Sequence, residues 1–125
     1  MIIKCRAIVK GYAEGDIIYS EQPINFLAMV DDNGMIIDEN HILYKQNIAD
    51  KILVFPNAIG SSVGAYTIYR LKRNNRAPKG IICKEVDITT ASGCAISNIP
   101  LVDKPEYRLE GIRGRAIIDN DKIIL

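Results

Sequence analysis

A short apolar run that ends in a proline, followed by a glycine, two serines and a helix, constrains this chain more than any other feature. The run Lys51–Phe55 is apolar after its first residue and is stopped by Pro56. A run of this length without polar alternation is typical of a strand that is buried on both faces. We therefore expect this strand to lie in the centre of a sheet.

The segment Ser61–Arg73 is the best helix candidate in the sequence. Its last turn is rich in positive charge, which suits the negative end of a helix dipole, and Asn74 follows it. The apolar face of this helix is predicted to consist of Gly64, Ala65, Ile68 and Leu71. Because the apolar run Ile81–Cys83 comes next, residues 51–83 have the length of a strand, helix, strand unit with a right-handed crossover.

Short strand-like runs surround this unit. They are predicted at Ile2–Val9, Asp16–Tyr19, Asn25–Val30, Met35–Ile37, Ala95–Ile96, Pro100–Val102, Ile112–Ile118 and Lys122–Leu125. The chain has 23 isoleucines against 6 valines and 7 leucines, and β-branched side chains favour strands, although codon usage can also raise isoleucine content. We therefore predict an α/β fold rich in β structure, with one main helix after the Gly-Ser-Ser loop.

The length and charge of the chain limit its partners. Its 125 residues are enough for a single domain, 1–125, with one core. Its 16 basic residues are balanced by 15 acidic ones, which argues against nucleic acid or an anionic membrane as a partner. No apolar run approaches the roughly 20 residues that span a bilayer, and the first ten residues lack the order of a signal peptide, so we expect a cytoplasmic protein.

The cysteines and the single histidine offer no metal site by their spacing. Cys5, Cys83 and Cys94 are an odd number without a CxxC pair, so we expect reduced thiols and no metal bound by this chain. Cys5 and Cys83 lie in apolar runs and are expected to pack as small hydrophobes, whereas the environment of Cys94 stays open. His41 lies in a polar turn, where we expect a surface or capping residue rather than a catalytic one.

The loop around Gly60, Ser61 and Ser62 is the candidate functional site. It connects a buried strand to a helix, which places two hydroxyls among free N–H groups at the positive end of the helix dipole. A serine there is either a simple helix cap or a group that binds an anion or transfers a proton. A serine base needs its alkoxide stabilised by N–H groups or a nearby cation. The exposed cations Arg70, Arg73, Lys79 and Lys84 are expected to be solvated surface charges.

Several segments, taken in order, give the chain a resemblance to a known family. They are Gly11, Gly15, the Asp31–His41 segment, Val54–Pro56, Gly60–Gly64, Ala77–Pro78 and Asn98–Pro100. In this order and spacing they resemble the small subunit of the archaeal aconitase X family, from the first strand to about Asp103. This resemblance implies a swivelling β/β/α domain like that of aconitases.

The resemblance also implies an activity and a partner. Members of this family include dehydratases that convert mevalonate 5-phosphate to trans-anhydromevalonate 5-phosphate in the archaeal mevalonate route to isoprenoids. The small subunit forms a heterodimer with a large subunit whose cysteines hold a 4Fe-4S cluster, and it is active only there. The cluster would therefore lie in the partner, and the ligand would be a small phosphorylated hydroxy acid.

The site residues implied by the resemblance fall in the Gly-Ser-Ser segment. Ser61 is the favoured proton acceptor, by similarity to the Gly-Ser-Ser segment of aconitases, and Ser62 is the second candidate. Gly60, Val63 and Gly64 are the implied substrate-binding residues. The stretch Asn57–Ile59 departs from the family, which often has glycine and arginine there, so a loop cation is missing.

Two other functions remain open from the sequence. One is a related dehydratase subunit for another hydroxy acid, such as 3-hydroxyproline. The other is a non-catalytic binding or assembly module in which the serines only cap a helix.

Overall fold

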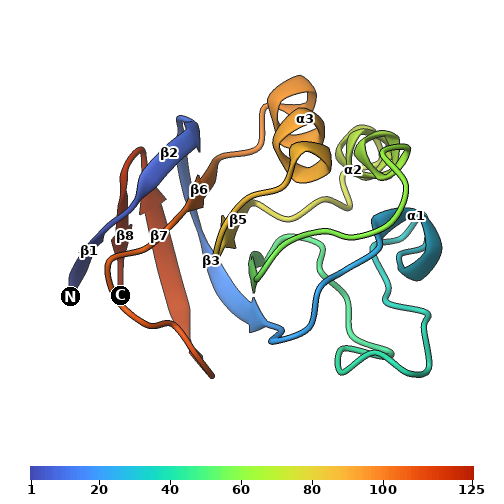
Figure 1. The fold of residues 1–125 in the computed structure, drawn as a ribbon, viewed down its shortest axis with the longest axis horizontal. Helices are drawn as coiled ribbons and strands as arrows, with labels where there is room; N and C mark the ends of the chain where they lie inside the picture. The colour runs from blue at the N-terminus through green and yellow to red at the C-terminus, as the bar shows by residue number, and fades with distance from the viewer.

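The computed structural model describes all residues 1–125 and contains one mixed sheet with three helices beside it (Figure 1). The strands are β1 (Ile2–Lys4), β2 (Arg6–Val9), β3 (Tyr12–Tyr19), β4 (Ile52–Phe55), β5 (Gly80–Cys83), β6 (Leu101–Asp103), β7 (Arg115–Asp119) and β8 (Lys122–Ile124). The helices are α1 (Phe26–Met29), α2 (Gly64–Arg73) and α3 (Ile88–Ser97). The predicted α/β fold rich in β structure is therefore confirmed.

The sheet closes on itself through its first segment. Its strand order is β1-β8-β7-β3-β4-β5-β6-β2, so the two end strands are neighbours in the chain and are separated only by Cys5. β1 pairs with β8 and β2 pairs with β6, both antiparallel, while the Cys5 N–H donates to the Asp121 carbonyl across the break. One extended segment therefore joins the two ends of the sheet.

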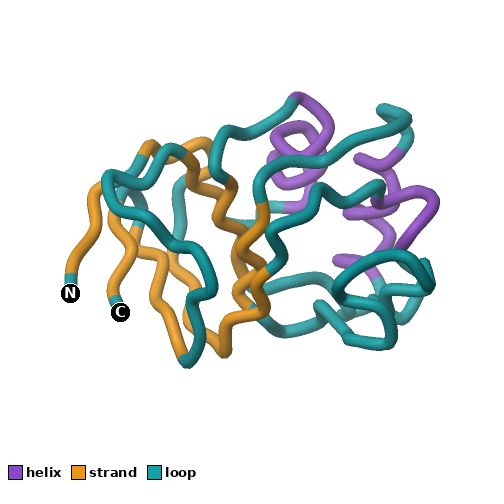
Figure 2. Tube along the Cα trace, turned by 60° about the horizontal axis from the view of Figure 1, so that its bottom comes forward, coloured by secondary structure: helices purple, strands orange, loops and turns teal.

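Closure creates an inner and an outer apolar face. The inner cluster consists of Ile3, Ala13, Ile52, Val54, Ile82, Val102, Leu109, Ala116, Ile118 and Ile123. On β4 the alternate residues Leu53 and Phe55 face outward and join a cluster with Ile68 of α2 and Cys94 of α3. Figure 2 shows the consequence, with the strands gathered at one side and the helices at the other.

The central strand, helix, strand unit is confirmed. β4 is completely buried and lies between β3 and β5, both parallel to it, and β6 continues the parallel set. The carboxyl ends of four strands therefore meet at one edge of the sheet. Helix α2 begins at Gly64, three residues later than predicted, and ends at its predicted position before Asn74.

A second helix of ten residues, α3, was not predicted. The prediction of a strand at Ala95–Ile96 is wrong, because both residues belong to α3. Asp87 begins this helix as its N-cap: one carboxylate oxygen accepts from the Thr90 N–H at 2.9 Å. The other accepts from the Ala58 N–H at 2.7 Å, so the same side chain also holds the loop after β4.

Three other strand predictions need correction. Asn25–Val30 forms the short helix α1, because the Asn25 side chain caps it by accepting from the Ala28 N–H at 3.1 Å. The strand predicted at Asp16–Tyr19 begins earlier, at Tyr12, because Gly15, expected to form a turn before it, lies buried inside the eight-residue strand β3. Met35–Ile37 makes only isolated bridges, to Val30 and Asn47.

His41 is buried and has a structural role. Its Nε2 lies 3.0 Å from the Pro23 carbonyl, and its Nδ1 accepts from the Leu43 N–H at 3.0 Å. Because Nδ1 is the acceptor, Nε2 carries the proton and donates to Pro23. The ring ties two loops together, so the predicted surface position is wrong, and the hydrogen bond from Leu43 confirms the capping role.

No helix of the structure combines the length and the apolar character that a membrane crossing requires.

The closing strand β2 is fastened by an ion pair. Arg6 donates two hydrogen bonds of 2.8 Å to the carboxylate of Asp103, which is completely buried and also accepts from the Val86 N–H. Burial alone would raise the pKa of Asp103. The hydrogen bonds from Arg6 and Val86 and the positive charges of Arg6 and Lys104 outweigh it, so this pKa lies below its ordinary value.

Removing the Asp103 carboxylate should destabilise the closed sheet. Asp103→Ala is expected to lower the free energy of unfolding by about 2 to 3 kcal/mol, because the Val86 N–H and Arg6 lose their partner. Because the pKa of Asp103 is lower in the folded than in the unfolded protein, its carboxylate stabilises the fold at any pH above the unfolded pKa. This stabilisation is lost as the pH falls through the folded pKa. Stability of the wild type should therefore drop below about pH 4, measured by urea unfolding, and less steeply in Asp103→Ala.

The control for this prediction is Asp32→Ala, which removes an exposed pair with Arg70. It should change stability by less than about 0.5 kcal/mol. Equal losses in the two variants would contradict a special role for Asp103.

Replacing Asp87 should loosen the loop after β4. Asp87→Ser keeps an oxygen that can cap α3, but the shorter side chain no longer reaches the Ala58 N–H. We expect hydrogen exchange at Ala58 to accelerate about tenfold or more, with only about 1 kcal/mol lost from global stability. Asp38→Ser, in an exposed turn, is the control and should leave Ala58 unchanged. Unchanged exchange at Ala58 in Asp87→Ser would refute the anchoring role.

Candidate functional site

The Gly-Ser-Ser loop lies where the sequence predicts it, between the end of β4 and the start of α2. It leaves the carboxyl edge of the parallel strands at Pro56 and returns to the helix at Gly64. Gly60, Ser61, Ser62 and Val63 are exposed, whereas Gly64 is buried against Thr89 and the α1 backbone. The predicted site residues are therefore brought together on one surface loop.

Gly60 has a backbone that other residues adopt only with strain. Its φ is +88°, in the left-handed region. A Cβ at this position would also overlap the side-chain amide of Asn25. Both restrictions require glycine here, which explains the sharp turn that presents the two serines.

Ser61 and Ser62 differ in their hydrogen bonds. The Ser61 Oγ accepts from the Val63 N–H at 3.1 Å, while the Ser62 hydroxyl has no partner in the chain. The N–H groups of Gly64 and Ala65 donate to the carbonyls of Ser61 and Ser62, which makes a tight turn before the helix. Ser61 therefore caps this turn, and α2 itself, whose N-cap is Val63, has no side-chain cap.

Three consecutive N–H groups of the turn have no partner within the chain. These are the N–H groups of Gly60, Ser61 and Ser62, which donate to no backbone or side-chain acceptor. By contrast, the N–H groups of Val63 and Gly64 are used within the turn. Successive free N–H groups around a left-handed residue are typical of anion-binding loops. The arrangement can therefore hold an anionic oxygen beside a serine hydroxyl.

The loop is held in place from two sides. Ile24 forms a parallel bridge with Ala58, with its carbonyl accepting from the Ile59 N–H at 3.0 Å. On the other side, Asp87 accepts from Ala58 as described above. These bonds fix the residues directly before Gly60, so the turn begins from a segment that is held in place.

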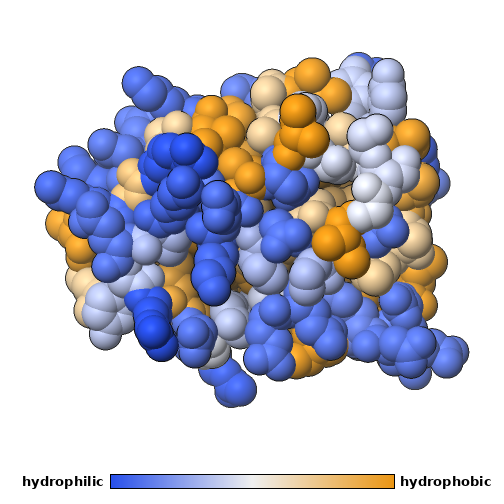
Figure 3. All heavy atoms as spheres, in the orientation of Figure 1, coloured by the Kyte–Doolittle hydropathy of each residue, from blue (hydrophilic) through white to orange (hydrophobic).

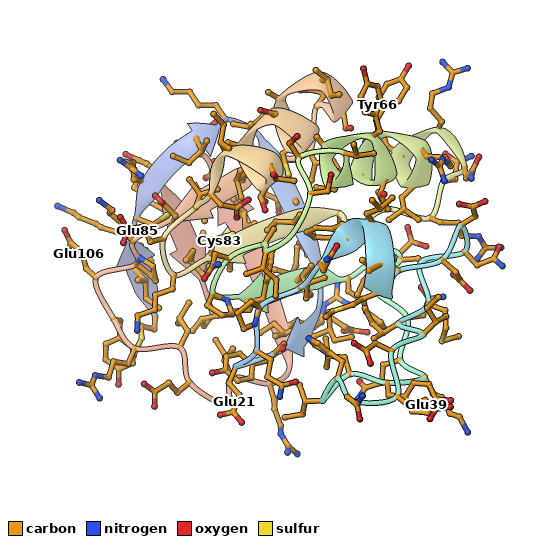
Figure 4. All side chains as sticks on the ribbon, turned by 45° about the vertical axis from the view of Figure 1, so that its right-hand side comes forward. Glu21, Glu39, Tyr66, Cys83, Glu85 and Glu106 are labelled. Carbon is orange, nitrogen blue, oxygen red and sulfur yellow. The ribbon has the colours of Figure 1, made fainter.

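A groove of about 960 Å³ lies along the same edge of the sheet and reaches Pro56, the first residue of the loop. Its walls come from the ends of β3, β4 and β5 and from residues 104–111. Figure 4 labels Glu21, Cys83 and Glu106, three of the lining residues, on separate parts of the chain. The charged residues of the groove are balanced in number: three are basic, Lys84, Lys104 and Arg108, and three are acidic, Glu21, Glu106 and Glu110.

The predicted solvated cations are exposed, and only one of them is paired. Arg73, Lys79 and Lys84 make no ion pair, while Arg70 contacts Asp32 at 3.0 Å. The loop itself contains no cation, because residues 57–59 are Asn, Ala and Ile.

The cysteines of this chain do not fit an iron–sulfur cluster. Cys83 and Cys94 are completely buried and Cys5 is half-buried, and no three metal-ligating side chains come together. Burial raises the pKa of Cys94 to about 12, that of Cys5 to about 11 and that of Cys83 well above its ordinary value, so all three are thiols rather than thiolates. The packing role predicted for Cys83 is confirmed, and Cys94 packs in the same way.

Sequence reasoning missed Asn25 and Asp87, which position the loop. Asp87 had a detectable signal, because aspartate is a common N-cap residue and Asp87 stands directly before the segment that forms α3. Asn25 had none, because its contact with Gly60 joins segments 35 residues apart in the chain.

Known proteins match this sequence and this fold. The chain is 50% identical over 104 residues to the phosphomevalonate dehydratase small subunit of Thermococcus kodakarensis, which covers 82% of this chain and 78% of that protein. It is 47% identical over 103 residues to the protein of the same name from Methanococcoides burtonii, with 82% and 75% covered.

A solved structure agrees. The crystal structure of Thermococcus kodakaraensis aconitase X in its holo form superposes with a TM-score of 0.92 and 41% identity, covering 98% of this chain and 96% of that one. The model of the aconitase X swivel domain matches residues 2–124. The resemblance noted from the glycine, proline and serine motifs is thus confirmed, and the chain belongs to the aconitase X swivel-domain family.

Proposed function

We propose that this chain is the small subunit of a hydro-lyase that dehydrates mevalonate 5-phosphate to trans-anhydromevalonate 5-phosphate in the archaeal mevalonate pathway. The observation that carries this proposal is the exposed turn at Gly60–Ser62, which combines three free N–H groups with a serine hydroxyl. The names of the relatives support the substrate.

In the proposed reaction, Ser61 accepts a proton from the carbon next to the substrate carboxylate. The electron pair of that C–H bond forms the new C=C bond while the C–O bond on the adjacent carbon breaks. The departing hydroxide takes a proton from solvent to become water, and the serine later releases the abstracted proton, so that water is the only second product. The free N–H groups bind substrate oxygens, which keeps the acidic carbon within reach of the serine.

The hydrogen bond to Ser61 supports its assignment as the base. A serine hydroxyl is too weak an acid to be deprotonated without help, so its alkoxide must be stabilised. The Val63 N–H already donates to the Ser61 Oγ, and this bond becomes stronger when the oxygen carries charge. Ser62 has no such donor, and its exposed hydroxyl is free to contact the substrate.

The partner in this proposal is a large subunit, with which the chain forms a heterodimer. A 4Fe-4S cluster held by that subunit would supply the Lewis acid for the leaving hydroxyl, since the cysteines of this chain cannot. The name "small subunit" of the relatives supports such a partner.

Exposed apolar side chains around the turn also support a partner. They are Leu27, Ile59, Val63, Tyr66 and Ile88, contributed by α1, the loop, α2 and α3. Figure 3 shows hydrophobic residues at the surface over the region where Figure 1 places α3. Clustered apolar residues of this kind are typical of protein interfaces.

Co-expression with a large subunit should reconstitute the activity. We expect dehydration of mevalonate 5-phosphate when both chains are present and the cluster is rebuilt anaerobically, with none from either chain alone. Full activity of the large subunit alone would reject the proposal. Turnover of 3-hydroxyproline instead of mevalonate 5-phosphate would reject the substrate assignment.

Serine variants in the reconstituted complex should identify the base. Ser61→Ala is expected to lower kcat by about 100- to 10,000-fold, the usual loss for a general base. Ser62→Ala should cost less than about tenfold, and Ser92→Ala, an exposed serine on α3, is the control that should cost nothing. A large loss in Ser62→Ala alone would transfer the role to Ser62, and normal rates in both would show that the serines only cap the turn.

A further inference from the structure

Asn25 is anchored directly beside the serine turn. Its neighbours Ile24 and Phe26 are completely buried, and Ile24 forms the parallel bridge with Ala58. This register brings Asn25 alongside Gly60, where its side-chain amide fills the space that a Cβ would occupy. The position of the amide is therefore fixed by core packing and by backbone pairing.

The orientation of the Asn25 amide follows from its cap. Its Oδ1 accepts from the Ala28 N–H at 3.1 Å, which assigns the oxygen to α1, and Nδ2 is the amide atom nearest to the position that a Cβ of Gly60 would take. Nδ2 donates to no acceptor in the chain, whereas its oxygen is used. The amide therefore presents a free donor at the turn.

A second asparagine in the chain provides an internal comparison. Asn47 also lies against a glycine of positive φ, Gly34, and its Oδ1 also accepts a local N–H, that of Ala49. There, however, Nδ2 donates to the Asn33 carbonyl at 2.9 Å. Asn47, beside Gly34, therefore uses both the oxygen and the nitrogen of its amide. Asn25, beside Gly60, uses only the oxygen and leaves Nδ2 without an acceptor.

We propose that Asn25 binds the substrate, with Nδ2 donating a hydrogen bond to an oxygen of its carboxylate at the Gly60–Ser62 turn. This inference rests on the function proposed above. The donors at this place are all uncharged N–H groups, from Asn25 and from the backbone of Gly60, Ser61 and Ser62, and they suit an oxyanion.

The chemistry favours the carboxylate in particular. When a base takes the proton from the neighbouring carbon, the negative charge that develops spreads onto the carboxylate oxygens. A preorganised donor at those oxygens therefore stabilises the transition state more than the bound substrate. An amide donor would also serve in place of the cation that this loop lacks.

Two variants separate binding from capping. Asn25→Ser and Asn25→Asp both keep an oxygen for the α1 cap, but neither has the Nδ2 donor, and Asp adds a charge that repels a carboxylate. In the reconstituted complex we expect kcat/KM for mevalonate 5-phosphate to fall about 10- to 100-fold in Asn25→Ser, and further in Asn25→Asp. Much of the loss should be in kcat, and both variants should unfold within about 3 °C of the wild type.

Asn47→Ser is the matched control, because it alters the structural Asn–Gly pair and should leave kcat and KM unchanged. Wild-type values of kcat and KM in Asn25→Ser would overturn the inference while leaving the proposed function intact. The inference would also be overturned if Asn47→Ser lowered kcat/KM as much as Asn25→Ser does. The same holds if the loss of kcat/KM in Asn25→Ser were accompanied by a matching loss of Tm. If the wild-type complex does not dehydrate mevalonate 5-phosphate, the proposed function fails and the role of Asn25 fails with it.

Discussion

The closure of the sheet by residues 2–9 is the constraint on which the rest of the structure depends. This single segment pairs with β8 on one side and with β6 on the other, so the sheet has no free edge. The inner face is then filled by one apolar cluster, and the helices cover only part of the outer face. Because closure fixes the relative positions of β3 to β6, it also fixes the edge from which the serine loop leaves. The buried Asp103, bonded to Arg6 and to Val86, fastens this closure where β2 meets that edge.

The serine loop has a fixed first part and an exposed turn. Ile24 and Asp87 hold Ala58 and Ile59, while Gly60–Ser62 project with unpaired N–H groups into solvent. A turn that only linked a strand to a helix would have no need of so many fixed contacts. In the proposed function, this turn would supply an anion site and one or two hydroxyls to a reaction centre that a second protein completes.

Local signals account for the parts that the sequence predicted well. The apolar run of β4, the loop, α2 and β5 follow one another within 33 residues, and the terminal hairpin is formed around Asn120–Asp121.

The failures have a common physical cause. Asn25–Val30 has the residue types of a strand, but a four-residue helix forms there because Asn25 caps it and Phe26 packs edge-on against Phe55 of β4. Ala95–Ile96 is apolar like a strand, yet the cap at Asp87 sets a helix through it. Closure of the sheet and the contact of Asn25 with Gly60 depend on long-range packing, which no short pattern reveals.

The most direct test of the account is hydrogen exchange at the substrate carbon next to the carboxylate. Mevalonate 5-phosphate is incubated in D₂O with the reconstituted complex, and deuterium at that carbon is followed by NMR. If Ser61 accepts the proton, the wild-type complex will incorporate deuterium at this carbon, and Ser61→Ala will reduce the rate by at least about 100-fold. Incorporation at the wild-type rate in Ser61→Ala would contradict the central claim that this turn carries the base.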